Sequence, residues 1–229
     1  MHKRSTIVLT ALCGFLGTIA LTLYFTAPFT FMPLPPPDAT IGQIFTFGKT
    51  YPTTILADVW LQQIGTILTV IFALSLVHIA GASGKLAGKL TLLASAVITS
   101  LSLAEGTFEL GALQAGNNGH LEAMLTCFDL TNVFIHIFLL APSLFIMLGF
   151  ALRGTHVLPK LLITIAIILG ILFQTLGVVA LFDNKFLLAV IIILMIQNLW
   201  TIISSIFLLL RKVQYPLLAG GREHYQNAR

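Results

Sequence analysis

The chain has 229 residues, of which 57% are hydrophobic and only 9% are charged, and its formal net charge is +4. A soluble domain usually carries about 25% charged residues, so this composition excludes a water-soluble globular surface. The basic residues form no dense run, which argues against a nucleic acid partner and favours contacts with lipid headgroups. The mean hydropathy of +0.99 predicts an all-α membrane protein, because a helix satisfies its own backbone hydrogen bonds inside lipid.

Six apolar segments are long enough to cross a hydrocarbon core about 30 Å thick, which takes about 20 residues. They cover approximately residues 6–26, 57–80, 90–113, 128–152, 158–182 and 186–210. We expect them to form a single transmembrane helical domain over 1–229. In the fourth segment Pro142 removes the backbone hydrogen bond to Phe138 and predicts a kink.

The first segment follows Lys3 and Arg4, as the apolar part of a signal peptide does. It is longer than a typical signal core, however, and the only plausible small-residue cleavage site, Ala27, precedes Pro28. We therefore expect an uncleaved first helix. The long connection after it, residues 27–56, is rich in proline and aromatic residues, which favour an extended conformation and the membrane interface.

Lysine and arginine predict the orientation, because cytoplasmic loops of membrane proteins are enriched in both. With six spans and a cytoplasmic N-terminus, ten basic residues lie inside and two, Lys49 and Lys185, lie outside. The ten are Lys3, Arg4, Lys85, Lys89, Arg153, Lys160, Arg211, Lys212, Arg222 and Arg229. We expect both termini, including the tail 211–229, to be cytoplasmic, and the protein to reside in a plasma membrane, as in the inner membrane of a bacterium.

Two glutamates interrupt the third apolar segment near its predicted outer end. Glu105 and Glu109 are separated by four residues, so they share one helix face. A charged side chain at the centre of a bilayer costs about 2.5 to 3.5 kcal/mol and less near the interface. We therefore expect both glutamates to face the interior of the bundle or a hydrated cavity.

Other spans carry polar side chains at a comparable depth. Asp129, Asn132 and His136 share one face of the fourth segment, and consecutive antiparallel helices usually pack together, so we expect this face to meet the glutamates. Asp58 and Gln62 lie on one face of the second segment, and Gln174 lies in the fifth. Together these positions predict a polar pocket that opens outward. The expected binding or proton-relay residues are Glu105, Glu109, Asp129, Asn132, His136, Asp58, Gln62 and Gln174.

Within the spans no Lys or Arg accompanies these acids, and His136 is the only neighbouring side chain that can become a cation. Two carboxylates one helical turn apart cannot both remain ionised in lipid without hydration, hydrogen bonds or a cation. Our first hypothesis is proton- or cation-coupled transport of a small solute, with Glu105 and Glu109 exchanging protons and His136 responding at physiological pH.

Two alternatives remain open. A divalent metal site, structural or catalytic, could use Glu105, Glu109, His136 and Asp129, with His120 or Glu122 as further ligands, although no HExxH motif or thiolate cluster supports it. Alternatively, the chain could be an accessory subunit of a membrane complex whose polar pocket only stabilises the bundle. Because GxxxxGK[ST], Rossmann and GxSxG motifs are missing from the sequence, nucleotide use and serine hydrolysis lack support. We predict no organic cofactor, and enzymatic activity only if the metal site is catalytic.

Overall fold

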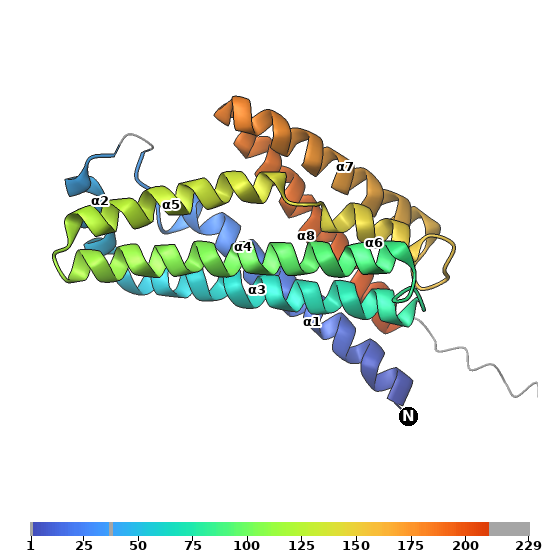
Figure 1. The fold of residues 1–229 in the computed structure, drawn as a ribbon. Coiled ribbons are helices and arrows are strands. Elements are labelled where there is room, and N and C mark those ends of the chain that lie inside the picture. Colours follow the sequence, from blue (N-terminus) through green and yellow to red (C-terminus); the bar gives the residue numbers. More distant parts are fainter. Residues whose placement is uncertain (1, 37–38, 211–229) are drawn as a thin grey trace, which may run out of the picture.

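The computed structural model describes residues 2–36 and 39–210, and within these ranges the secondary structure is helical, with no strand. Figure 1 shows the fold. The helices are α1 (His2–Thr30), α2 (Ile41–Thr50), α3 (Pro52–Ile79), α4 (Leu86–Asn117), α5 (Leu121–Leu140), α6 (Leu144–Leu152), α7 (Lys160–Phe182) and α8 (Leu187–Leu210), with a 3-10 turn, η1 (Asn184–Phe186), before α8. Asp38 and the predicted cytoplasmic tail 211–229 lie outside the described residues.

Six spans are long and apolar enough to cross a membrane, as predicted, and the fourth is α5 and α6 taken together. The second, third and fourth spans begin four to seven residues earlier than the apolar segments indicate. The added turns carry polar residues such as Lys89 and Glu122, which suit the headgroup region. These helices therefore extend beyond their apolar segments, which is why hydropathy placed their starts too late.

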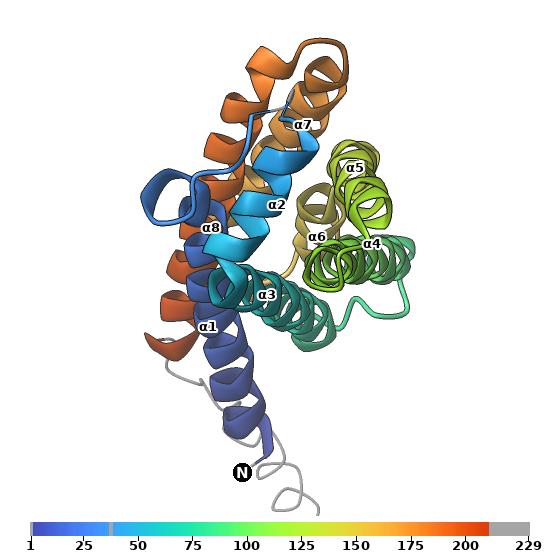
Figure 2. The same cartoon turned by 90° about the vertical axis from the view of Figure 1, so that its left-hand side faces the viewer.

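The spans pack as a closed ring in which each contacts the next along the chain, and α8 returns to contact α1. Figure 2 views this ring roughly along α3 and α4. Because α1 lies between α3 and α8, its small residues allow close approach: a Cβ on Gly17 would stand 2.9 Å from the Thr69 backbone nitrogen of α3. Small residues at such contacts are typical of helix packing in membranes.

Pro142 divides the fourth span into two helices, a larger change than the predicted kink. After α5 ends at Leu140, Ala141 is extended and α6 begins at Leu144. Two backbone groups at the break are bonded by Gln174 of α7: its Oε1 accepts from the Ser143 N–H at 3.1 Å, and its Nε2 donates to the Leu139 carbonyl at 3.4 Å. A neighbouring helix thus satisfies the polar backbone that the proline releases.

The connection predicted to be extended contains a ten-residue helix, α2. Its first turn is fixed by a capping box, in which the Gln43 Oε1 accepts from the Thr40 N–H at 2.8 Å and the Thr40 Oγ1 accepts from the Gln43 N–H at 3.4 Å. Only the stretch before it, described for residues 32–36 and 39–40, is without helix. The second span follows α2 almost directly, so α2 is held over one end of the bundle, where it contacts α3, α4 and α5.

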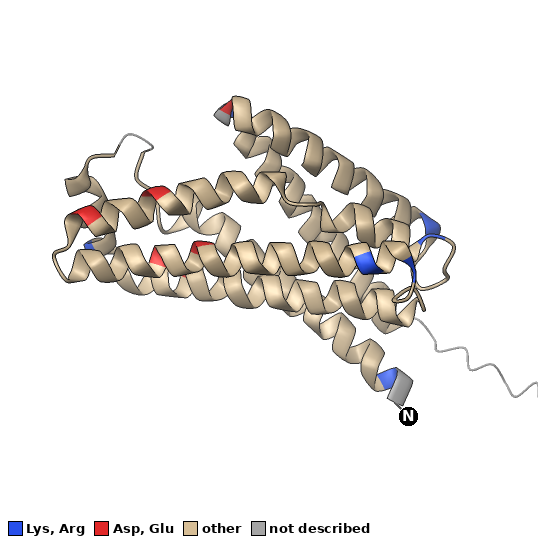
Figure 3. Ribbon diagram, in the orientation of Figure 1, with Lys and Arg blue, Asp and Glu red and all other residues tan. Residues whose placement is uncertain are grey.

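The two ends of the bundle differ in packing and in charge. We call the end that carries α2 and the α4–α5 turn the α2 end, and the opposite one the N-terminal end (Figure 1). The largest apolar core, which includes Phe72, Leu76, Leu148, Leu152 and Leu208, lies toward the N-terminal end. Figure 3 shows most described Lys and Arg residues at that same end, whereas Asp and Glu lie toward the α2 end or at the α7–α8 turn.

Candidate functional site

Glu105 of α4 is the centre of a buried hydrogen-bonded group at the α2 end. Its side chain is only 8% exposed, and each carboxylate oxygen has a donor from a different helix. The Gln62 Nε2 of α3 donates to Oε2 at 2.7 Å, and the Tyr24 hydroxyl of α1 donates to Oε1 at 3.5 Å. Three helices that follow one another in the ring therefore meet at this carboxylate.

Two further acids lie one helical turn from this contact, because Asp58 precedes Gln62 by four residues on α3 and Glu109 follows Glu105 by four residues on α4. We call Asp58, Glu105 and Glu109 the acid cluster. Asp58 is only 5% exposed. Its Oδ1 and the Oε2 of Glu109 are buried, and neither has a hydrogen-bond partner among the described residues. The cluster thus has two buried carboxyl oxygens without a partner among the described residues, and buried carboxyl groups need protons, hydrogen bonds or a cation inside a membrane.

The contact between α3 and α4 places these side chains. Gln63 donates to the Ser102 carbonyl at 2.6 Å, and the Ser102 hydroxyl donates to Thr66 at 3.3 Å. Gly106 makes the contact close, since a Cβ there would stand 2.5 Å from the Gln63 Nε2. Ser102 and Gly106 therefore lie on the surface of α4 on which α3 packs, and this contact brings Gln62 within reach of Glu105.

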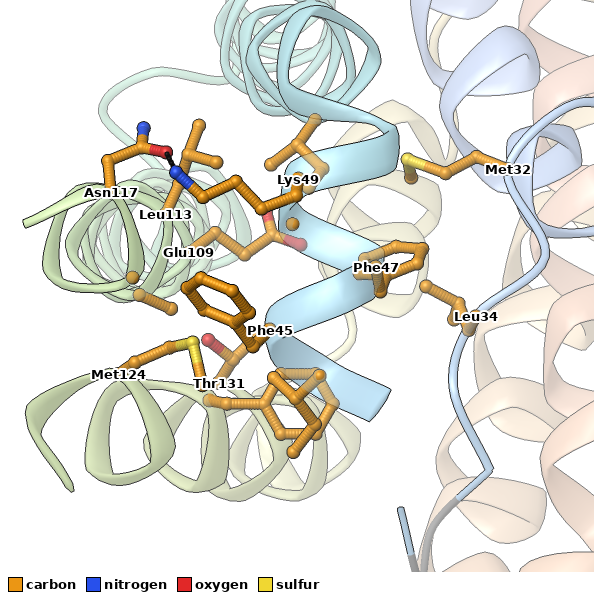
Figure 4. A pocket seen from close by; sticks show the side chains of 16 residues that line it. Met32, Leu34, Phe45, Phe47, Lys49, Glu109, Leu113, Asn117, Met124 and Thr131 are labelled. Atoms are coloured by element: carbon orange, nitrogen blue, oxygen red, sulfur yellow. Dashed lines mark hydrogen bonds between the residues drawn. The ribbon is translucent and has the colours of Figure 1, made fainter. Parts of the chain in front are cut away.

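A partly open cavity of about 70 Å³ lies beside the cluster and is lined by α2, α4, α5, the start of α3 and the segment after α1. Figure 4 shows the Glu109 side chain extending from α4 toward α2, with Phe45 beside it. The lining is mostly apolar and aromatic, and its polar members are Lys49, Glu109, Asn117 and Thr131. Glu109 therefore belongs to both the acid cluster and the cavity wall, which connects the buried carboxylates to a space at the α2 end.

Of the predicted site residues, Gln62 donates to Glu105, and Asp58 and Glu109 lie one helical turn from these two. The prediction that Asp129, Asn132 and His136 of α5 meet them was wrong in its geometry. Asp129 and Asn132 are exposed, and the His136 Nδ1 lies 2.7 Å from the Asn132 carbonyl of its own helix.

The reason is the rotation of α5 and α4 about their axes. The surface of α5 that lines the cavity carries Met124, Phe128 and Thr131, so the polar stripe next to it turns away from the bundle. The Glu105 face of α4 meets α3 and α1 instead of α5. Gln174 also lies outside the acid cluster, since its side-chain amide bonds to the break between α5 and α6.

Two residues of the site were not predicted. Tyr24 donates to Glu105, and its signal in the sequence was a lone hydroxyl-bearing aromatic residue in an apolar helix, too weak without knowledge that its side chain reaches α4. Lys49 lines the cavity because α2 folds back over it. The acid cluster therefore has a lysine nearby that the spans alone did not indicate, although its Nζ is bonded to the Asn117 Oδ1 at 3.3 Å.

In the described part of the chain, no three His, Cys, Asp or Glu side chains are arranged so that they could hold a metal ion. The metal site therefore remains a hypothesis from the sequence. No known protein family matches the chain, and no curated protein and no solved structure matches it either. The site must be interpreted from its own geometry.

Proposed function

We propose that this protein is a multi-pass transporter that binds a proton or a cation at the acid cluster and couples it to the movement of a small solute. The observation that supports this most is the placement of three carboxyl groups in spanning helices, two of them with buried oxygens that lack a partner among the described residues. Intramembrane acids are rare and usually mark ion or substrate pathways.

The residues have distinct roles in this proposal. Glu105, held by Gln62 and Tyr24, is the group whose loss or gain of a proton changes the contacts among α1, α3 and α4. Glu109 faces the cavity and exchanges protons or the cation with the solution at the α2 end. Asp58 supplies a third carboxyl group, so the cluster can hold more than one proton.

The divided fourth span supports a transport role. Discontinuous helices are a recurring feature of transporters, whose binding sites are often formed by the ends of half-helices and by unwound backbone near the midplane of the bilayer. Here α5 carries part of the cavity wall, while α6 belongs to the packed core at the N-terminal end. The extended residue Ala141 and the side chain of Gln174 join two parts of the molecule that can differ in mobility.

The orientation completes the proposal. Because basic residues are enriched on the cytoplasmic side, we infer that the N-terminal end is cytoplasmic and that the cavity opens to the outside. Of the described bases, Arg4, Lys85, Lys89, Arg153 and Lys160 belong to the N-terminal end. The proposed location is a plasma membrane, the inner membrane if the source is bacterial.

Reconstitution tests this function. Proteoliposomes that contain a pH-sensitive dye are given a pH gradient and challenged with panels of small amines, amino acids, sugars and organic acids. We expect at least one class to drive proton flux in the wild type. The Glu105→Gln variant should give the flux of empty liposomes, because it cannot exchange a proton at the centre of the site.

Glu122→Gln is the matched control, since Glu122 is exposed and lies outside the cavity lining and the acid cluster. It should transport like the wild type. If no solute and no gradient produces flux, transport is contradicted. If Glu105→Gln and Glu109→Gln both fold and leave the proton flux unchanged, the acid cluster only stabilises the helix bundle, as expected for an accessory subunit.

A further inference from the structure

The cavity beside Glu109 is lined by few polar side chains, and most of these already make a hydrogen bond. Of its four polar lining side chains, three are already engaged: Lys49 bonds to Asn117 at 3.3 Å, and the Thr131 hydroxyl donates to the Cys127 carbonyl of its own helix at 3.1 Å. The Glu109 Oε2 is buried and has no partner among the described residues. Among the described residues of the lining, Glu109 is the one acidic side chain, so a ligand in this cavity meets a single carboxyl group.

The rest of the cavity lining is apolar and can contact the hydrocarbon part of a ligand. Aromatic rings come from two helices, Phe45 and Phe47 of α2 and Phe128 of α5, and methionine side chains complete the wall from α5 and from the segment after α1. Aromatic faces attract organic cations as well as apolar groups. The flexible thioether of Met124 adapts to irregular shapes.

We propose that this cavity binds a small organic cation, with its ammonium group on Glu109 and its apolar body against Phe45 and Phe128. The inference deepens the proposed function by naming the class of solute, and it rests on that function only for the coupling to protons. The ammonium would occupy the carboxylate that otherwise carries a proton, so cation and proton would compete for the same group.

Other ligand classes fit this wall poorly. An inorganic divalent cation requires several oxygen ligands, whereas the cavity offers one free carboxylate in an apolar setting. An anion would meet Glu109, and a neutral apolar molecule would leave a buried carboxylate unpaired, which is costly. Lys49 is an exposed member of the lining, with its Nζ bonded to Asn117 and 5.5 Å from the centroid of the Phe45 ring, so an organic cation on Glu109 would share the cavity with this ammonium group.

Binding of three matched compounds tests the inference on the full-length protein in nanodiscs. Benzylamine, benzyl alcohol and benzoate share a ring and differ in charge at the substituent. We expect radiolabelled benzylamine to bind with saturation, and the alcohol and benzoate to compete at least about tenfold more weakly, the change expected from loss of one charge-assisted hydrogen bond. Empty nanodiscs correct for partition into lipid.

Variants separate the carboxylate from general effects. Glu109→Gln should lower benzylamine affinity about tenfold or more, while its affinity for benzyl alcohol should stay within about twofold of the wild type. Glu122→Gln should bind like the wild type. Equal binding of the three compounds to wild-type protein, no saturable binding of benzylamine, or a folded Glu109→Gln protein that binds benzylamine normally would each overturn the proposal.

The two proposals can fail separately. If benzylamine binds with saturation and its binding depends on Glu109, but proteoliposomes show no proton flux, the cation site is supported and coupled transport is contradicted. If a sugar or an organic acid drives proton flux that depends on Glu105, and benzylamine does not bind, transport is supported and an organic cation is excluded as the solute.

Discussion

A single glycine sets the separation of the two helices that carry the acid cluster. At Gly106 a side chain would collide with the Gln63 amide and would stand 3.0 Å from Val59. The hydrogen bond from Gln63 to the Ser102 carbonyl depends on this gap, and so does the reach of Gln62 to Glu105. The chemistry of the site thus depends on a residue with no side chain of its own.

Gly106→Val should therefore destabilise the folded protein by about 1 to 3 kcal/mol, the usual cost of overpacking. Gly42→Val is the matched control, because a Cβ on Gly42 of α2 meets no atom within 4 Å, and its effect should stay within about 0.5 kcal/mol. Thermal unfolding in detergent compares the two. Equal melting temperatures for both variants would mean that α3 and α4 are not held together at Gly106.

The sequence was informative about which side chains share a helix face and uninformative about what each face meets. Asp58 and Gln62, like Glu105 and Glu109, were correctly grouped by helical spacing. The helix that packs against the Glu105 face was predicted incorrectly. Helix α4 has neighbours on both sides, and helical periodicity does not show whether a face meets α3 or α5. Asp129 and Asn132 illustrate the error, since they share a face that the packing of α5 leaves exposed.

At the scale of the helices, the break in the fourth span obtains its hydrogen-bond partners from another helix, α7. Pro142 predicted a disturbance of the backbone, but the helix break also needs hydrogen-bond partners from outside its own span. Gln174 supplies them, and Gly177 lets α7 approach so closely that a Cβ there would stand 2.8 Å from the Leu139 carbonyl oxygen. Helix α2, by contrast, had a local signal in the sequence, the capping pair Thr40 and Gln43.

Replacement of Gln174 by leucine should destabilise the bundle, because the Ser143 N–H and the Leu139 carbonyl would then lack their partner. An unsatisfied buried polar group costs about 1 to 3 kcal/mol. Thr175→Leu, at the next and exposed position of α7, should have little effect on the melting temperature in detergent. If Gln174→Leu is as stable as Thr175→Leu, water or lipid already satisfies the break.

At the scale of the whole molecule, some features could be predicted from the sequence and others could not. The number and the approximate positions of the spans could be predicted from hydropathy, because a segment that crosses a membrane needs a minimum apolar length. The ring order and the placement of α2 over the cavity could not, because they depend on side-chain packing between segments far apart in the chain. The orientation rests on the asymmetry of Lys and Arg alone.

Cysteine labelling tests that orientation. In a background with Cys13 and Cys127 replaced, Ser83→Cys marks the α3–α4 turn and Asn118→Cys marks the α4–α5 turn, both exposed. A membrane-impermeant maleimide should label Asn118→Cys in intact cells and Ser83→Cys only after permeabilisation. The reverse pattern would place the cavity in the cytoplasm, and labelling of both sites in intact cells would contradict the count of spans.

The length of α4 has a consequence for the lipid around it. Its 32 residues extend about 48 Å at about 1.5 Å per residue, and a tilt of about 40° would still leave a rise of about 37 Å, more than a hydrocarbon layer about 30 Å thick. With Lys89 at one headgroup layer, Glu109 stands about 20 residues further, a rise of about 30 Å for an upright helix and about 23 Å at a tilt of about 40°. The tilt of α4 thus decides whether this carboxyl group lies at the opposite boundary or within the depth of the hydrocarbon layer.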